Sequence, residues 1–120
     1  MTGRGDRKDT ANTRTLPIVL AVGTGPELTA RCRDAATAAK ALFERTDVAG
    51  AATAAAQLRP MVLVISEDVF EFDAAEFEAL ARDVRGKLLC ADEEISVNVL
   101  EPRLRGALRD AARLRGIGST

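Results

Sequence analysis

The stretch RPMVLVISEDVFEF, residues 59–72, decides the fold class of this chain. Its apolar run, Met61–Ile65, is short and unbroken, and it leads directly into the polar residues Ser66–Asp68. Such a run is typical of a strand that is buried on both faces of a parallel sheet. In an open parallel sheet, ligand and catalytic sites form at the carboxyl ends of the strands. The stretch therefore marks either an active site or the place where one has been lost.

On both sides of this stretch, strand patterns alternate with helix patterns. Strands are predicted over residues 16–22, 40–45, 61–65, 87–91 and 95–100, and helices over residues 26–38, 48–59, 73–84 and 101–115. Residues 40–45 could also continue the preceding helix, but Thr46-Asp47 makes a good N-cap for a new helix, which favours a strand. Right-handed crossovers place the helices on both faces of the sheet, so the alternation predicts a doubly wound, mostly parallel five-stranded sheet.

The composition excludes several classes of function. The chain of 120 residues carries a net charge of −1, and it has four Phe but no Trp or Tyr, which argues against nucleic-acid binding. It has no histidine, and therefore lacks the usual general base, zinc ligand and phosphorelay acceptor. Cys32 and Cys90 are far apart and without CxxC spacing, which favours two buried, reduced thiols over a disulfide or redox pair.

The chain is expected to form one cytoplasmic domain over residues 16–116. Residues 1–15 are polar and predicted to be a disordered tail without the apolar core of a secretory signal, and residues 117–120 are predicted to fray. No apolar run is long enough to span a membrane, so no membrane span is predicted.

Three motifs resemble the receiver domain of bacterial response regulators, a flavodoxin-like fold with strand order 2-1-3-4-5. RPMVLVIS resembles the run that ends in the phosphoacceptor aspartate of the family, LLCA the strand that ends in Thr/Ser-Ala, and VNVLEP the strand that ends in Lys-Pro. The resemblance spans residues 16–115.

On this resemblance, the phosphoacceptor pocket is degenerate. Ser66 stands at the position of the acceptor aspartate, Cys90 at that of the switch hydroxyl, Glu101 at that of the lysine, and Ala21 and Val22 at those of the acidic pair that holds magnesium. The family chemistry needs a carboxylate nucleophile, a divalent ion, a lysine and a hydroxyl. Replacing a lysine by Glu101 alone disfavours a phosphoryl group by on the order of several kcal/mol at close range. The resemblance thus implies a pseudo-receiver that is not an enzyme and uses neither a metal nor a cofactor.

The family has a helix between its last two strands, where this chain offers only Asp92–Glu94. A parallel crossover normally needs about a dozen residues. We therefore expect the fourth helix to be missing or reduced, and the last strand to be displaced, antiparallel or paired with another chain. The uncovered edge predicts a homodimer through the fifth strand and the last helix. The interaction face predicted for it comprises Val97, Val99, Leu104, Leu108, Arg105 and Arg109.

Other patterns admit a functional and a plain interpretation, and the plain one is favoured. For Gly23–Gly25 we expect a plain turn, and the alternative is a phosphate-binding turn. For Ser66–Asp68 we expect a solvated loop, and the alternatives are a metal site and a site phosphorylated by another kinase. Acidic and basic residues form two separate blocks along the sequence. We expect both blocks to be solvated faces, and the alternative is that they are docking surfaces. The acidic block comprises Glu67, Asp68, Glu71, Asp73, Glu76 and Glu78, and the basic block Arg103, Arg105, Arg109, Arg113 and Arg115.

The function expected from these features is a non-catalytic, phosphorylation-independent interaction module in bacterial signal transduction or cell organisation. The alternatives are a small-ligand or nucleotide-binding protein of flavodoxin-like fold, and a structural subunit of a homodimer or larger assembly. The partner protein is not identified by the sequence.

Overall fold

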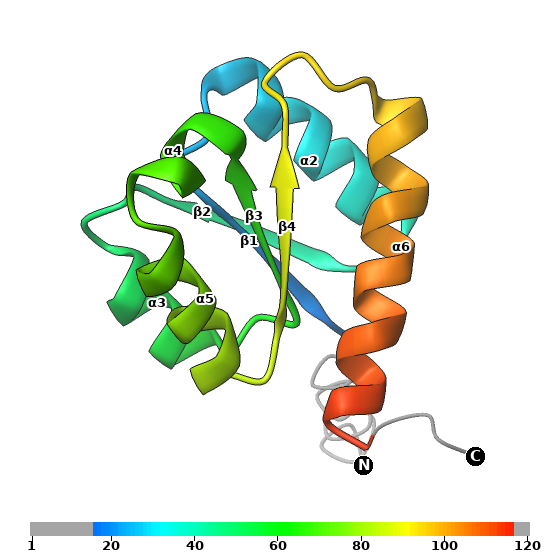
Figure 1. Cartoon of the computed structure of the whole chain (residues 1–120). Coiled ribbons are helices and arrows are strands. Elements are labelled where there is room, and N and C mark those ends of the chain that lie inside the picture. The colour runs from blue at the N-terminus through cyan, green and yellow to red at the C-terminus, as the bar shows by residue number, and fades with distance from the viewer. Residues whose placement is uncertain (1–15, 117–120) are drawn as a thin grey trace, which may run out of the picture.

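The chain forms an α/β fold around a four-stranded parallel sheet of order β2-β1-β3-β4, which is flavodoxin-like in topology (Figure 1). The computed structural model describes residues 16–116, so the predicted tail 1–15 and end 117–120 lie outside the described part. The strands are β1 (Ile18–Val22), β2 (Leu42–Thr46), β3 (Val62–Ser66) and β4 (Lys87–Ala91). The helices are α2 (Pro26–Ala38), α3 (Ala51–Leu58), α4 (Glu67–Phe72), α5 (Ala74–Asp83) and α6 (Val97–Leu114). The predicted parallel α/β class and the first four places of the strand order are confirmed.

Strand β3 is the centre of the fold, as its unbroken apolar run predicts. Every residue of β3 is buried, and β3 pairs in parallel with β1 on one side and with β4 on the other. The register aligns Val22 with Ile65 and Ser66 with Ala91. The carboxyl ends of β1, β3 and β4 consequently meet at one edge of the sheet.

The sheet separates two apolar clusters because successive side chains of a strand point to opposite faces. One cluster joins β1, β3 and β4 to Leu28 and Cys32 of α2 and to Leu100 and Leu104 of α6. The other joins the same strands to helices α3 and α5, with Phe77 as its buried aromatic residue. Helices α2 and α6 therefore cover one face, and α3, α4 and α5 the other (Figure 1).

The predicted fifth strand is wrong, because residues 97–100 form the first turn of α6, which Ser96 precedes as N-cap residue. Within the described residues the sheet ends at β4. Leu100 and Leu104 lie one helical turn apart and are fully buried against α2 and the sheet, and this burial favours a helix over an exposed strand. Since no strand follows β4, no crossover is needed, and residues 92–96 suffice to connect β4 to α6. The predicted homodimer edge at a fifth strand is absent from residues 16–116 for the same reason.

The solvated loop predicted at residues 66–68 is also wrong. Helix α4 follows β3 without a linker and begins at Glu67. Glu67 and Asp68 lie in its first turn, where the positive end of the helix dipole stabilises carboxylates. Residues 40–45, which could also have continued the preceding helix, are confirmed as a strand, with bounds shifted to Leu42–Thr46. Among residues 16–116, no helix is both long and apolar enough to cross a membrane.

Candidate functional site at the carboxyl end of the sheet

Ser66 lies at the carboxyl tip of β3, where the receiver family has its acceptor, but its hydroxyl serves the helix that follows. The side chain is 2% exposed, and Oγ accepts a hydrogen bond from the Val69 N–H at 3.4 Å as the N-cap of α4. Ala21 and Val22, at the neighbouring end of β1, are fully buried and have no polar side-chain atoms. Three of the five predicted pocket residues are thus adjacent in the sheet and offer no free nucleophile.

Cys90 lies on β4 beside Ile65 and is half-buried. Burial raises the pKa of its thiol, and the carboxylate of Glu67 raises it further, against the opposing charge of Arg103. A thiol is mostly protonated at neutral pH already at its ordinary pKa, and this upward shift further reduces the thiolate, which is the reactive form.

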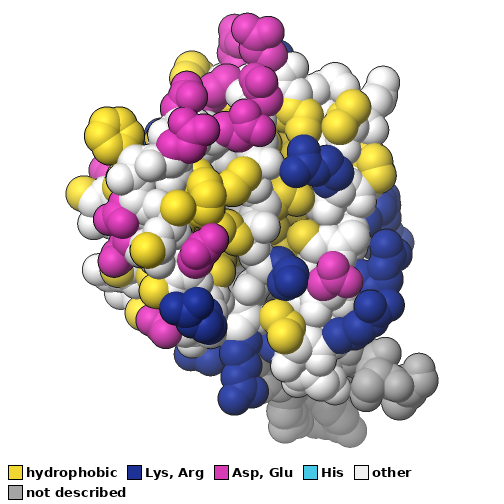
Figure 2. Space-filling view, viewed as in Figure 1, with side chains coloured by type: hydrophobic (Ala, Val, Ile, Leu, Met, Phe, Trp, Pro, Cys, Tyr) yellow, Lys and Arg dark blue, Asp and Glu magenta, His cyan; other side chains and the backbone are white. Residues whose placement is uncertain are grey.

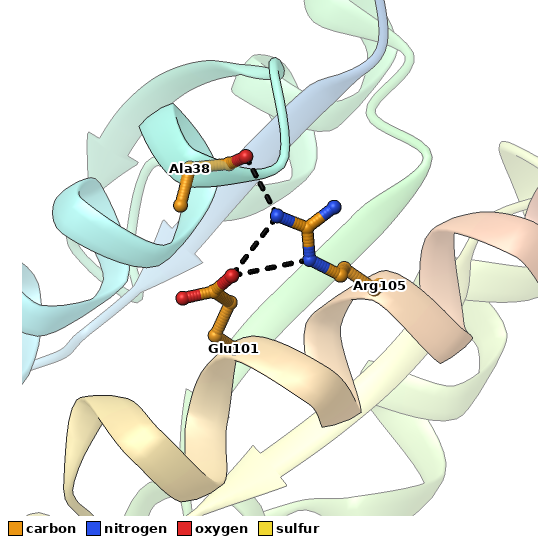
Figure 3. A network of polar contacts seen from close by, with 3 residues as sticks. All are labelled: Ala38, Glu101 and Arg105. Carbon is orange, nitrogen blue, oxygen red and sulfur yellow. Dashed lines mark hydrogen bonds and ion pairs between the residues drawn. The ribbon is translucent and has the colours of Figure 1, made fainter.

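Glu101 is not part of this pocket. Its Oε2 lies 3.2 Å from Nε and 2.9 Å from Nη2 of Arg105, one turn further along α6. Arg105 Nη2 also donates to the carbonyl oxygen of Ala38, the last residue of α2, at 2.8 Å (Figure 3). Glu101 therefore faces the carboxyl end of α2. It does not take the place of a lysine beside Ser66, because the strand that would carry it there is a helix.

Five carboxylates surround the hollow above the strand tips. A hollow of about 230 Å³ is lined by Glu67, Asp68, Asp92, Glu93 and Glu94. Acidic side chains gather in this region, over α4 and the loop before α6, while Lys and Arg gather on the side of α6 (Figure 2). In the described part of the chain, no three Cys, Asp or Glu side chains come close enough to hold a metal ion. The site as it stands presents negative charge without a converging ligand set.

The role of Asp92–Glu94 was not foreseen, although an acidic run after a predicted strand was a usable signal. Carboxyl ends of neighbouring parallel strands meet at one edge, so acids after β3 and after β4 had to lie close together. The pattern of the second run, Asp92–Glu94, predicts only a connection between two strands.

The Gly23–Gly25 turn is closed by a carboxylate of the chain itself. Glu93 Oε2 accepts a 3.3 Å hydrogen bond from the Gly25 N–H at the N-terminus of α2, and Arg31 Nη1 donates to the Glu93 carbonyl at 2.7 Å. A Cβ atom on Gly25 would lie 3.2 Å from Glu93 Oε1. The position at which a phosphate would meet this helix end is thus taken by Glu93.

Thr24 makes no side-chain cap to α2 and instead joins a buried polar pair. Its Oγ1 lies 2.6 Å from Thr29 Oγ1, and its carbonyl oxygen accepts hydrogen bonds from the Arg45 guanidinium of β2. The turn is therefore fastened to both α2 and β2.

The predicted interaction face on α6 divides into two sets of residues. Leu104 is fully buried and therefore not available to a partner, whereas Leu108 packs against the same core cluster but is only half-buried. Val99, Arg105 and Arg109 are exposed, and Val97 is half-buried. Of the six residues of the predicted face, Leu104 alone is fully buried, and the other five keep some exposed surface.

The parallel strand order 2-1-3-4 is a flavodoxin-like feature, and folds of this kind host many unrelated functions. The function of this chain must therefore be argued from the residues at its sites. Neither a protein-family model nor a curated protein matches the sequence.

Proposed function

We propose that this chain is a pseudo-receiver, a non-catalytic and phosphorylation-independent module that acts through protein–protein contacts in bacterial signalling or cell organisation. The observation that carries the proposal is the acidic hollow at the strand tips, which is lined by five carboxylates and by no Lys or Arg. At an effective dielectric constant of about 20, a carboxylate roughly 5 Å from a phosphoryl charge costs about 3 kcal/mol, and solvent screening reduces this cost at the exposed carboxylates of the hollow. Since no Lys or Arg lines the hollow to offset these charges, a phosphoryl group in it is disfavoured.

The side chains next to the hollow support the same proposal. Ser66 is buried and occupied as a helix cap, and no histidine exists to activate it as a nucleophile. The raised pKa of Cys90 further lowers the small fraction of reactive thiolate. A scaffold with these properties can present a surface to a partner but has little means of accepting a phosphoryl group.

The proposal is tested by incubating the full chain with acetyl phosphate and magnesium and measuring its intact mass. The expected result is no stable increment of one phosphate, while a receiver domain with an intact acceptor aspartate, treated in parallel, gains one. The variant Ser66→Ala locates any increment that does occur. A phosphate that is stable on the wild type would overturn the proposal, at the strand tip if Ser66→Ala abolishes it and at another side chain if it persists.

Two alternatives receive less support from the geometry. A nucleotide or flavin at the Gly23–Gly25 turn would have to displace the Glu93 carboxylate, and a thermal-shift screen with these ligands is expected to give no stabilisation. An assembly through a fifth strand loses its basis because the sheet of the described residues ends at β4. Part of the β4 edge is occupied, since Arg103 Nη2 donates to the Cys90 carbonyl at 3.1 Å.

A further inference from the structure

The two faces of the sheet are covered differently. On one face, α2 and α6 pack directly against each other. On the other, α3 contacts β1 and α5 contacts β4, but the two helices make few contacts with each other. A groove of about 530 Å³ lies between α3 and the α4–α5 segment. The strand side chains beneath are fully buried, so the groove is a hollow on the outer surface of this helical layer.

The groove is mainly apolar and carries the most exposed aromatic residue of the described chain. Its lining residues are Val48, Ala49, Ala51, Ala52, Val69, Phe72, Asp73, Glu76, Phe77 and Leu80. Phe72 is 94% exposed and Val48 is 48% exposed. Large apolar side chains that gather around a hollow, rather than being scattered singly, are typical of an interaction site.

The charges at the groove indicate what it would bind. Asp73 and Glu76 contribute two carboxylates to its lining, and no Lys or Arg lines it. Glu71, next to Phe72, is also exposed. A complementary occupant combines apolar side chains with positive charges, whereas a nucleic acid or an acidic peptide would be repelled.

We propose that this groove binds one amphipathic helix of a partner protein, with an apolar stripe flanked by Lys or Arg. A helix laid along the groove would rest on α3, α4 and α5, whose residues line it together with the loop before α3. The alanines of α3 permit close approach, and Phe72 and Val48 would be covered by apolar residues spaced i, i+3, i+4 and i+7 on the partner. This inference rests on the proposed function and names the class of partner that the module recognises.

The test uses the full chain and a fluorescently labelled peptide of about 18 residues, five helical turns, composed of leucine and lysine with the leucines at helical spacing. Binding is measured by fluorescence anisotropy at low salt, with a scrambled peptide of the same composition as the reference. We expect saturable binding that is at least tenfold tighter than that of the scrambled peptide.

Three variants locate the binding site. Phe72→Ser removes an exposed anchor without disturbing the core and is expected to weaken binding about tenfold, as truncation of a hot-spot residue does. Glu76→Lys reverses a charge in the groove, and Glu78→Lys makes the same change on an exposed residue of the same helix that lines a different hollow. We expect Glu76→Lys to weaken binding several-fold more than Glu78→Lys, although both change the net charge equally.

The proposal is overturned if the peptide fails to saturate the protein, if the scrambled peptide binds as tightly, or if Glu78→Lys weakens binding as much as Glu76→Lys. It is also overturned if light scattering finds a dimer that Phe72→Ser converts to a monomer, since the groove would then belong to a second copy. These failures are distinguishable from failure of the proposed function, which the phosphorylation experiment decides independently.

Discussion

Arg115 Nη2 donates a 2.8 Å hydrogen bond to the backbone carbonyl of Pro60 and thereby ties the end of α6 to the start of β3. The same guanidinium reaches the carbonyls of Arg59 at 3.0 Å, Val84 at 2.8 Å and Arg85 at 3.2 Å. Arg59 and Val84 are the C-cap residues of α3 and α5. The last carbonyl groups of a helix have no hydrogen-bond partner within the helix. A cation near them is also stabilised by the negative end of the helix dipole. One side chain therefore satisfies groups from two helices at the amino-terminal edge of the sheet.

Removing this guanidinium should destabilise the fold measurably. We expect Arg115→Ala to lower the free energy of unfolding by about 2–3 kcal/mol, because hydrogen bonds from a charged donor are lost and partly buried carbonyls are left without partners. Arg115→Lys should recover less than half of this loss, since an ammonium lacks the planar fork of donors. Urea denaturation followed by circular dichroism measures both. The control is Arg113→Ala, which breaks only an exposed ion pair with Asp110 and should cost under about 0.5 kcal/mol. Equal effects at the two positions would contradict this account of Arg115.

Gly86 and Gly106 should respond in opposite directions to the same substitution. A Cβ atom on Gly86 would lie 2.7 Å from the Pro60 carbonyl oxygen and 3.1 Å from that of Met61, and neither backbone atom can move aside easily. Gly86→Ala is therefore expected to destabilise the protein by about 1–3 kcal/mol. Gly106 lies inside α6, where the nearest atom to an added Cβ is 3.9 Å away, so Gly106→Ala should stabilise it by up to about 1 kcal/mol. Thermal unfolding of the two variants checks the signs, and two shifts in the same direction would refute the prediction.

The parts of the fold that the sequence predicted are those whose local and tertiary signals agree. Strand β3 combines an unbroken apolar run with a preceding Pro60, and helix α2 combines Pro26 and Glu27 at its start with an apolar stripe. The four residues Val97–Leu100 fit both a two-residue alternation and the spacing of one helical turn. Contacts of Leu100 and Leu104 with α2 and the sheet decide between the two, and a single sequence does not reveal those contacts.

The candidate site was predictable only in part. Ser66, Glu67 and Asp68 were identified because they follow the central strand directly. The hydrogen bond between Glu93 and Gly25 joins residues 68 positions apart, and no local sequence pattern predicts it. The exposure of Phe72 has no local signal either, because large aromatic side chains are usually buried, whereas this one is 94% exposed.

Glu93 should stabilise α2 and the loop before α6 together. Its carboxylate accepts the Gly25 N–H at the positive end of α2, and its carbonyl accepts from Arg31. We expect Glu93→Ala to lower the free energy of unfolding by about 0.5–1 kcal/mol, an amount typical of a carboxylate at a helix N-terminus, and the loss should shrink at high salt. Glu94→Ala, which removes an exposed neighbouring carboxylate, should change it by less than half as much. Urea titrations at two salt concentrations distinguish the variants, and a larger effect at Glu94 would refute the role assigned to Glu93.

Cys32 should make the protein less stable at alkaline pH. Burial raises the pKa of its thiol from 9.0 to about 12, with a further contribution from the charge of Glu93. Between these two values the unfolded chain loses the thiol proton while the folded chain keeps it, so the free energy of unfolding falls as the pH rises through this window. From pH 8 to pH 10.5 this group alone should lower the free energy of unfolding by about 2 kcal/mol.

Urea denaturation of the wild type and of Cys32→Ala at both pH values measures this effect. The comparison separates the thiol from the lysines, which also titrate in this pH range. The variant begins less stable because of the small cavity it creates, but its stability should fall by about 2 kcal/mol less over this range. If wild type and variant lose stability in parallel, the Cys32 thiol is not held in its protonated form by the fold.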